Sequence, residues 1–172
     1  MEFRLLGPVQ VWAAGGCLEM GPPQQRAVLA ALAVDAGRPV FRGTLLDRIW
    51  SGRAPEGAAS ALYAHVNRIR RVLAAGAACE EPVRLARRSG GYVLEADPED
   101  VDLHRFRQLA LAARDRQRPD DERAKLLRAA LEGLGGMLLK FRVKSGESRV
   151  ISCQAVQAAI PARRVRSSMA AW

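Results

Sequence analysis

The pattern of apolar and polar positions is most informative between residues 58 and 73. Leu62, Val66, Ile69 and Leu73 recur at spacings of three and four, which places them on one face of a helix. The opposite face carries small, polar and basic side chains: Ser60, Ala64, Asn67, Arg68 and Arg71. No acidic residue occurs from Ala58 to Gly76. Two interpretations are open: a solvated amphipathic helix, or a helix that enters the DNA major groove, where Arg and Asn bond base edges bidentately.

The residues before this helix predict a small antiparallel sheet and two further helices. Apolar runs bounded by Gly and Pro predict strands, and paired prolines favour the start of a helix. The expected elements are strands over 3–12, with a break at Gly7–Pro8, and over 17–20, helices over 24–36 and 45–50, and an extended segment over 39–42. Gly37 stands where a C′ glycine would end the first helix, and Ser51–Gly52 would end the second.

A hairpin is predicted after the third helix. Residues 83–87 and 92–95 flank Arg88–Gly91, whose glycines supply the positive φ angles of a tight turn. The order of sheet, three helices and hairpin predicts a winged helix-turn-helix, with the hairpin as its wing. Three arginines are expected on or beside the hairpin tip, where a wing reaches phosphates or the minor groove: Arg84, Arg87 and Arg88.

Beyond Ala96 the pattern changes to two amphipathic helices. An acidic hinge at 97–100 precedes a helix over 102–114, with Asp102 as its N-cap, and a second helix is expected over 121–131. The apolar stripes are Leu103, Phe106, Leu109, Ala110 and Ala113 in the first helix and Ala124, Leu127 and Leu131, expected inward, in the second. Such a hairpin has the size of one tetratricopeptide-like unit, which cannot bury its apolar face alone. We therefore expect it to dock on the winged helix, near Trp12, or on a second copy.

Charge changes this picture mainly through its distribution. The 172 residues carry 27 basic and 18 acidic side chains, for a formal net charge of +9. Residues 1–96 and 141–172 hold the whole excess, whereas residues 97–140 are balanced. Arginine far outnumbers lysine, which suits recognition of phosphate and guanine, but a GC-rich genome also encodes arginine by default.

The sequence does not indicate metal or membrane chemistry. Cys17, Cys79 and Cys153 are far apart and have neither a CxxC motif nor zinc-ligand spacing, so reduced and mostly buried thiols are expected. Residues 3–12 are too short for a signal peptide, and no apolar run has the length of a membrane span. We therefore expect a cytoplasmic, nucleoid-associated protein without metal or cofactor.

Catalytic chemistry is not indicated either. The only histidines, His65 and His104, lack partners at the spacing of a metal site or a catalytic dyad. His65, near the edge of the third helix, has two open interpretations: contact with a backbone phosphate, or a structural role. No nucleophile elbow, P-loop or dinucleotide motif occurs, so neither an enzyme nor a small-molecule substrate is predicted. Four aromatic side chains are expected to pack rather than to stack on bases: Trp12, Trp50, Tyr63 and Tyr92.

Six segments together carry a family resemblance. They are FRLLGPVQVW at 3–12, PPQQRAVLAALAVDAGRPV at 22–40, LLDRIW at 45–50, ALYAHVNRIRRVL at 61–73, GGYVLEADPEDVDLHRF at 90–106 and AKLLRAAL at 124–131. In this order and spacing, the chain resembles the Streptomyces antibiotic regulatory proteins, the SARP-type transcriptional activators, over about residues 2–132. The resemblance implies an OmpR/PhoB-like winged helix and a helical bacterial transcriptional activation domain. It also implies binding to direct repeats upstream of biosynthetic-cluster promoters and recruitment of RNA polymerase holoenzyme.

The chain departs from the family pattern at three places. Phe41 stands where the family usually has Ser or Thr ahead of the second helix, so an N-cap worth roughly 1 kcal/mol is lost, and Thr44 is expected to replace it in part. Ala61 stands where the family often has Thr. The match ends near Glu132, and residues 133–172 are interpreted as a replaced or frame-shifted end or, alternatively, as an unrelated short tail.

The predicted fold is α+β: a winged helix-turn-helix with a small N-terminal antiparallel sheet, three helices and a C-terminal hairpin, followed by a short all-α tetratricopeptide-like hairpin. We expect a DNA-binding domain over 1–96, a partial activation domain over 97–132 and a divergent basic tail over 133–172, loosely ordered from 145. The predicted DNA-contacting residues are Ser60, Ala64, Asn67, Arg68 and Arg71 on the recognition helix, and Tyr63, His65, Arg84, Arg87 and Arg88 on the wing and flank.

The predicted function is sequence-specific binding to double-stranded DNA by a pathway-specific activator of secondary-metabolite genes. Expected partners are direct repeats in duplex DNA, RNA polymerase holoenzyme and a second copy on DNA, and no membrane. With a shortened activation domain, the protein is expected to bind DNA but to activate weakly. The alternative is a protein-interaction module in which residues 97–132 dock a partner and no specific DNA binding occurs.

Overall fold

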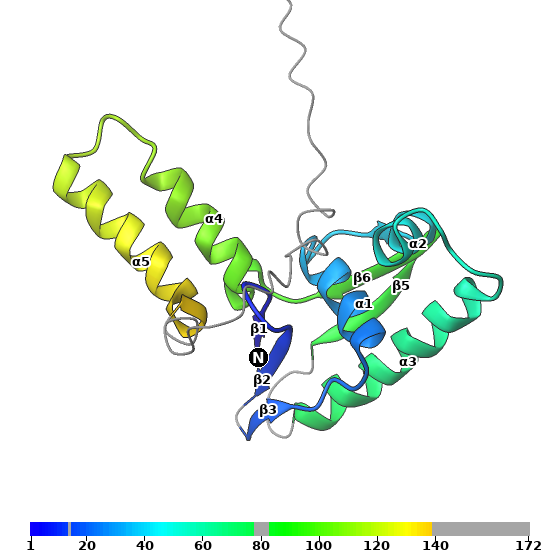
Figure 1. Ribbon diagram of the computed structural model, residues 1–172. Helices are drawn as coiled ribbons and strands as arrows, with labels where there is room; N and C mark the ends of the chain where they lie inside the picture. The colour runs from blue at the N-terminus through cyan, green and yellow to red at the C-terminus, as the bar shows by residue number, and fades with distance from the viewer. Residues whose placement is uncertain (14, 78–82, 139–172) are drawn as a thin grey trace, which may run out of the picture.

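The computed structural model describes residues 1–13, 15–77 and 83–138 (Figure 1). The N-terminal sheet consists of β1 (Glu2–Arg4), β2 (Gln10–Ala13) and β3 (Gly16–Leu18), in the antiparallel order β1-β2-β3. Phe3 pairs with Val11 across the first two strands, and both side chains are fully buried. The predicted strands and the break at Gly7–Pro8 are therefore confirmed.

Three helices follow: α1 (Pro23–Ala33), α2 (Arg42–Trp50) and α3 (Ala58–Gly76). The predicted apolar stripe of α3 is buried throughout, because α1, α2 and strand β5 pack against that helix. The guanidinium of Arg48 on α2 donates to the backbone oxygen of Ala31 and forms an ion pair with Asp35 at 2.6 Å. This contact ties α2 to the end of α1 and so fixes the helix that precedes α3.

The second sheet contains the wing. It consists of β4 (Val40–Phe41), β5 (Arg84–Arg88) and β6 (Gly91–Glu95), in the order β4-β6-β5. Ser89 and Gly90 form the two-residue turn between Arg88 and Gly91, with Gly90 at a φ of +76°. A Cβ atom at Gly91 would lie 2.0 Å from the backbone oxygen of Val40, so glycine is required there for β4 to pair with β6. The predicted hairpin is confirmed.

The remaining elements are a 3-10 turn, η1 (Pro98–Asp100), and the two helices α4 (Asp102–Ala112) and α5 (Asp120–Leu138). These helices form an antiparallel hairpin that projects away from the other helices (Figure 1). Val101 forms an isolated parallel bridge with Phe3 and is fully buried. The α+β fold class with a winged helix and a following helical hairpin is thus confirmed.

Two expectations about the ends of α1 and α2 are wrong. Gly37 has a φ of +75° but lies beyond the C-cap Val34 and donates to the backbone oxygen of Leu94, so it turns the chain toward the wing. Helix α2 begins at Arg42, with Phe41 as an N-cap that offers no side-chain acceptor; Thr44 lies inside the helix and does not replace the cap.

Asp102 is also not an N-cap. The N-cap of α4 is Val101, and the carboxylate of Asp102 accepts hydrogen bonds from the backbone N–H groups of Leu5 at 2.8 Å and Leu6 at 3.0 Å. The carboxylate of Asp102 binds the loop after β1 and not the first turn of α4. The N–H groups of Leu5 and Leu6 lie beyond the end of β1, and this carboxylate gives both of them an acceptor. Asp102 joins the helical hairpin to the N-terminal sheet instead of capping its own helix.

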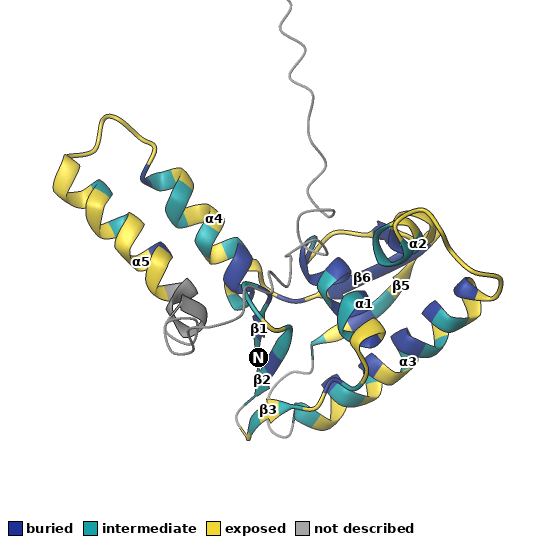
Figure 2. Ribbon diagram, viewed as in Figure 1, coloured by how far each residue is buried: buried dark blue, intermediate teal, exposed yellow. Residues whose placement is uncertain are grey.

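The inward face of α5 differs from the predicted one. Ala124, Leu127 and Leu131 are exposed, with Leu127 at 49% and Leu131 at 54%, whereas Ala130 is buried. Arg123 donates from Nε to the backbone oxygen of Ala113 at 3.0 Å and from Nη1 to Asp120. Figure 2 shows that most of the described outer surface of α5 is exposed. The hairpin packs through a smaller surface than its apolar spacing suggests.

Candidate nucleic-acid interface

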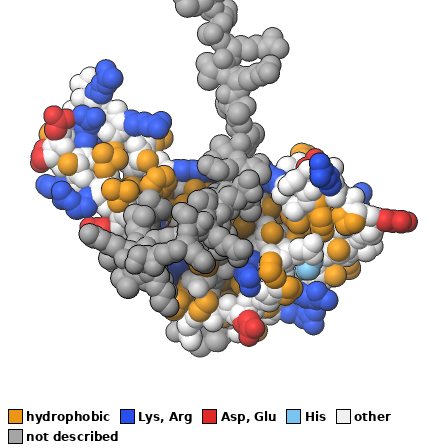
Figure 3. Space-filling view, viewed as in Figure 1, with side chains coloured by type: hydrophobic (Ala, Val, Ile, Leu, Met, Phe, Trp, Pro, Cys, Tyr) orange, Lys and Arg blue, Asp and Glu red, His pale blue; other side chains and the backbone are white. Residues whose placement is uncertain are grey.

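The polar face of α3 is the main candidate surface. Ser60, Tyr63, Arg68 and Arg71 are exposed, while Ala64 and Asn67 are half-buried. Figure 2 shows the two-sided character of this helix, with buried residues toward α1 and exposed residues on the outside. In the space-filling view, basic side chains and a histidine gather on this side of the molecule (Figure 3). The surface can therefore offer guanidinium and hydroxyl donors to an anionic ligand.

Tyr63 differs from the expectation that the aromatic side chains pack inside. Its side chain is 54% exposed, whereas Tyr92 on β6 is buried and Trp12 and Trp50 are half-buried. On the helical wheel, position 63 lies between the buried stripe and the polar face of α3, which is the flank of the helix. Its exposure adds a phenol beside the arginines of α3.

Arg70 connects α3 to the wing. Its Nε donates to the backbone oxygen of Leu85 at 2.7 Å, and its Nη1 donates to Oδ1 of Asn67 at 3.2 Å. The guanidinium also lies over the ring of Tyr92, at 5.9 Å from the centroid. From the sequence alone, no role was predicted for Arg70.

The wing arginines are not equivalent. Arg88 is adjacent to the turn and forms an ion pair with Glu95 at 2.7 Å, and Arg87 is exposed one residue earlier. Arg84 is exposed at the opposite end of β5, where it pairs with Glu95 in the strand register. The expectation that all three arginines lie at or beside the tip therefore holds for Arg87 and Arg88 and is wrong for Arg84.

His65 is buried, with 7% of its surface exposed, and its Nδ1 atom has no hydrogen-bond partner among the described residues. Burial, and secondly the nearby positive charge of Arg68, lower the pKa of this imidazole from its ordinary value. Of the two interpretations of His65, the structural role therefore fits better than a phosphate contact. His104 is half-buried and its Nε2 lies 3.2 Å from the backbone oxygen of Ala33.

Two neighbouring residues were missed as surface candidates. Phe41 is 63% exposed, and a Cβ atom at Gly90 of the wing turn would lie 3.5 Å from its ring. Arg42 is exposed, and its backbone N–H donates to the oxygen of Gly90. The signal in the sequence was Phe41 at the position of a capping residue. From the sequence alone, we interpreted this residue only as a lost cap.

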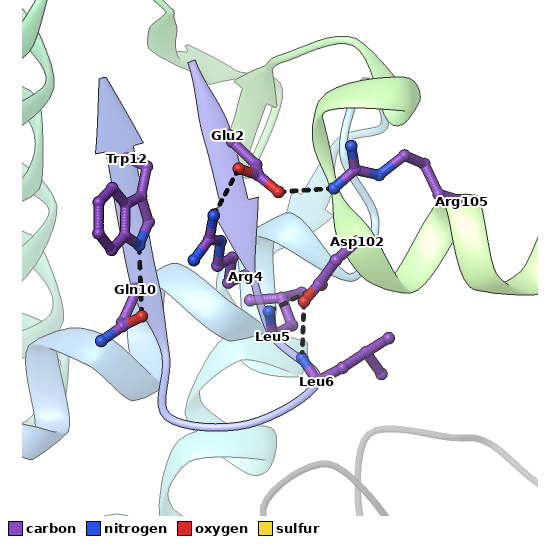
Figure 4. A network of polar contacts seen from close by, with 8 residues as sticks. All are labelled: Glu2, Arg4, Leu5, Leu6, Gln10, Trp12, Asp102 and Arg105. Carbon is purple, nitrogen blue, oxygen red and sulfur yellow. Dashed lines mark hydrogen bonds and ion pairs between the residues drawn. The ribbon is translucent and has the colours of Figure 1, made fainter. Parts of the chain in front are cut away.

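A polar network fastens the N-terminal sheet to α4 (Figure 4). Glu2 accepts from Arg4 at 3.0 Å and from Arg105 of α4 at 2.7 Å, close to the backbone contacts of Asp102. The hydrogen bond from Arg4 is the main cause that lowers the pKa of Glu2; partial burial opposes it and Arg105 adds to it. Arg4 also stacks over Trp12 at 4.6 Å. The helical hairpin therefore docks on the N-terminal sheet, as expected, through these polar contacts, whereas Leu127 and Leu131 of its apolar face remain exposed and are not packed near Trp12.

Within the described ranges, no group of His, Cys, Asp and Glu residues is arranged to hold a metal ion. Among the helices of the same ranges, none is long and apolar enough to cross a membrane. Cys17 is exposed, so a buried thiol is not found at this position. The other two cysteines and the expected loose order from residue 145 lie outside the described residues.

The fold and the arginine-bearing third helix define the class of protein as a winged helix-turn-helix regulator. Residues 20–94 match the family described as "Transcriptional regulatory protein, C terminal". The chain is 37% identical over 142 residues to the regulatory protein AfsR of Streptomyces coelicolor, covering 81% of this chain and 14% of AfsR. It is 35% identical over 169 residues to the transcriptional regulator RedD of the same organism, covering 96% of this chain and 46% of RedD. The chain is thus similar to transcriptional regulators of the SARP type, and the relatives that it matches are named as regulators.

A solved structure of Mycobacterium tuberculosis EmbR, in complex with a low affinity phosphopeptide, has the same fold over much of the chain. The TM-score is 0.64 at 33% identity, over 77% of this chain and 35% of EmbR. The chain thus spans less than half the length of AfsR, RedD and EmbR. The alignment with RedD reaches into residues 133–172 because it covers 96% of the chain, which is against the interpretation of that tail as a frame-shifted end.

Proposed function

We propose that this chain is a sequence-specific double-stranded DNA-binding regulator that acts as a pathway-specific activator of secondary-metabolite genes in the cytoplasm. The observation that carries the proposal is the division of α3. One face is buried in the core, and the other exposes arginine along a 19-residue helix without a carboxylate. A major groove admits a helix of this kind, and guanidinium groups bind both phosphates and guanine.

The contacts divide into those that read bases and those that hold the duplex. The proposed readers lie on the outer face of α3: Ser60, Ala64, Asn67, Arg68 and Arg71. Tyr63 lies beside them, and Arg87 and Arg88 of the wing would contact phosphates or the minor groove. Arg84, far from the turn, and the buried His65 contribute less in this arrangement. The proposed domains remain 1–96 for DNA binding, 97–132 for partial activation and 133–172 as a basic tail.

Salt dependence tests the proposal directly. If about five or six phosphates are neutralised, log K against log salt should have a slope of roughly −5, at about −0.9 per phosphate. Duplex binding would be measured by fluorescence anisotropy at several salt concentrations, with the full chain and a site selected from random duplexes. A flat salt dependence would overturn the nucleic-acid proposal.

Similarity to regulators of the SARP type supports two finer proposals, direct-repeat binding and recruitment of RNA polymerase holoenzyme. Two copies would occupy repeats about one helical turn apart, roughly 10–10.5 bp, on one side of the duplex. An insertion of half a turn between the repeats should abolish paired binding and leave binding to a single site intact. Unchanged pairing would mean that the two copies bind independently.

A second candidate function rests on the exposed leucines of the helical hairpin. Leu111, Leu127 and Leu131 are all about half or more exposed, and hydrophobic side chains are visible on this hairpin in Figure 3. Such a surface favours a protein-interaction module with residues 97–132 as the docking region. Salt-dependent duplex binding separates the two candidate functions. A DNA-binding regulator releases counterions when it neutralises phosphates, whereas a protein that only binds other proteins does not bind the duplex.

A further inference from the structure

Arg70 is held by three different elements. Its partners are the backbone oxygen of Leu85 on β5, the side-chain oxygen of Asn67 on α3 and the ring of Tyr92 on β6. The side chain is half-buried between the helix and the hairpin. An arginine fixed in this way is poorly placed to reach a base itself, but it determines how its neighbours are presented.

The hydrogen bond to the backbone oxygen of Leu85 explains why position 70 of α3 needs a long side chain with a donor. Among the described residues, strand β5 is at the edge of its sheet, so one side of it has no strand partner there. The two-residue turn pairs Arg88 with Gly91, and antiparallel pairs alternate between hydrogen-bonded and non-hydrogen-bonded, so the carbonyl of Leu85 faces the open edge. Arg70 occupies that acceptor from α3. The wing and the proposed recognition helix are therefore joined at one side chain.

The Asn67 contact fixes the orientation of an amide. A guanidinium has donors only, so the atom of Asn67 that faces Arg70 must be the oxygen. The oxygen keeps a second lone pair, but it is turned toward Arg70, so the Nδ2 hydrogens are the part of the amide that is left to face a ligand. Bidentate recognition of adenine needs an acceptor and a donor from the same amide, whereas guanine presents two acceptors, O6 and N7, in the major groove.

We propose that Arg70 is a positioning residue that makes Asn67 a donor-only reader, selecting guanine over adenine at one base pair. This inference rests on the proposed function, because it requires the outer face of α3 to enter the major groove. It assigns no base contact to Arg70 itself. The inference is based on two contacts of Arg70: one with the side-chain oxygen of Asn67 and one with the open edge of strand β5 in the wing.

The test uses the full chain and duplexes that differ from the selected site by single base pairs. The Asn67→Ala variant identifies the base pair that Asn67 reads, because the preference for one base pair over the others is lost at that position only. The wild type should prefer G·C to A·T there by about five-fold or more, within the usual range for one good bidentate contact. A 7-deazaguanine at that position, which lacks the N7 acceptor, should weaken wild-type binding.

Arg70→Met keeps the length of the side chain and removes its donors. We expect the preference at the Asn67 pair to fall or to shift toward A·T, while discrimination at the other pairs is kept. Arg107→Met, an exposed arginine on α4, is the matched control and should change neither affinity nor preference. A wild-type preference for A·T, an Asn67→Ala variant that loses affinity without losing a preference, or an Arg70→Met variant that weakens all duplexes equally would overturn the inference.

A measurement without DNA covers the case in which Arg70→Met does not fold. In NMR spectra of the wild type, the Nε–H of Arg70 should exchange slowly with water because it donates to the backbone oxygen of Leu85. Rapid exchange of that Nε–H would overturn this inference alone. Absence of salt-dependent duplex binding would instead overturn the proposed function and the inference with it.

Discussion

Helices α3 and α5 are equally long, 19 residues each, and carry apolar side chains at similar spacing, yet they differ in burial. The stripe of α3 is almost completely buried, because α1, α2 and β5 surround it. Leu127 and Leu131 of α5 are about half exposed, because that helix packs mainly on α4. Spacing thus predicts a helix, whereas the number of neighbouring elements determines which face is covered.

The largest expected effect comes from the same truncation in each helix. Leu62→Ala on α3 removes a fully buried side chain and should lower the free energy of unfolding by about 2–5 kcal/mol. Leu127→Ala on α5 should change it by no more than about 0.5 kcal/mol, as for other exposed positions. Urea unfolding followed by circular dichroism measures both. Equal losses would mean that Leu127 is covered by a part of the chain or a second copy, and the contrast between the helices would disappear.

The next effect concerns the junction between the two regions. Asp102→Ala leaves the N–H groups of Leu5 and Leu6 without their acceptor and should cost about 1.5–3 kcal/mol, the range for hydrogen bonds to a charged group. Hydrogen exchange at these two amides should become faster. Asp121→Ala, an exposed carboxylate with only a 3.7 Å ion pair to Lys125, is the control. Unchanged protection at Leu5 and Leu6 would show that the helical hairpin is held by other contacts.

A third effect separates base reading from backbone contact within the DNA-binding region. Arg71→Ala should cost about 1–3 kcal/mol of binding free energy and relax specificity at one base pair. Arg88→Ala should weaken specific and random duplexes about equally and reduce the salt slope by about one. Competition binding with both kinds of duplex measures the difference. If both variants lose the same affinity on both kinds of duplex, the proposed roles are wrong.

The smallest effect is a pH dependence that originates in α3. Because the folded state lowers the pKa of His65, the unfolded chain binds a proton that the folded chain resists as the pH falls below about 6.5. The contribution to stability is complete above that pH and decreases below it. His65→Gln should make the free energy of unfolding less dependent on pH between about 7.5 and 5.5. Parallel pH profiles for the two proteins would rule out this source.

The sequence predicted the winged helix because its signals are local. Strand composition, the glycines of the hairpin and the stripe of α3 each act within a few residues, and the structure agrees with all three. One error arose because a distant segment binds the side chain. Asp102 was expected to cap its own helix, but its acceptors are used by Leu5 and Leu6, nearly a hundred residues earlier.

The candidate site, like the fold, was predictable from the sequence where its residues lie on one helix, and not where distant segments meet. The exposed arginines of α3 follow from the helical wheel, and they lie on the expected face. Arg84 was misplaced because sequence alone does not give the strand register. The role of Arg70 depends on an open sheet edge that only the strand order reveals, and the exposure of Phe41 depends on how β4 meets the wing turn.

The bridge between Phe3 and Val101 sets an order of events during synthesis on the ribosome. Strand β1 and the loop after it are made before their partners, because Val101, which pairs with Phe3, and Asp102, which accepts from Leu5 and Leu6, follow the three helices and the wing. At about 5–20 residues per second, the first strand waits roughly 5–20 s for them. Closing so long a loop costs chain entropy that local helices do not pay. The backbone N–H groups of Leu5 and Leu6 therefore lack their native acceptor until residue 102 has been made.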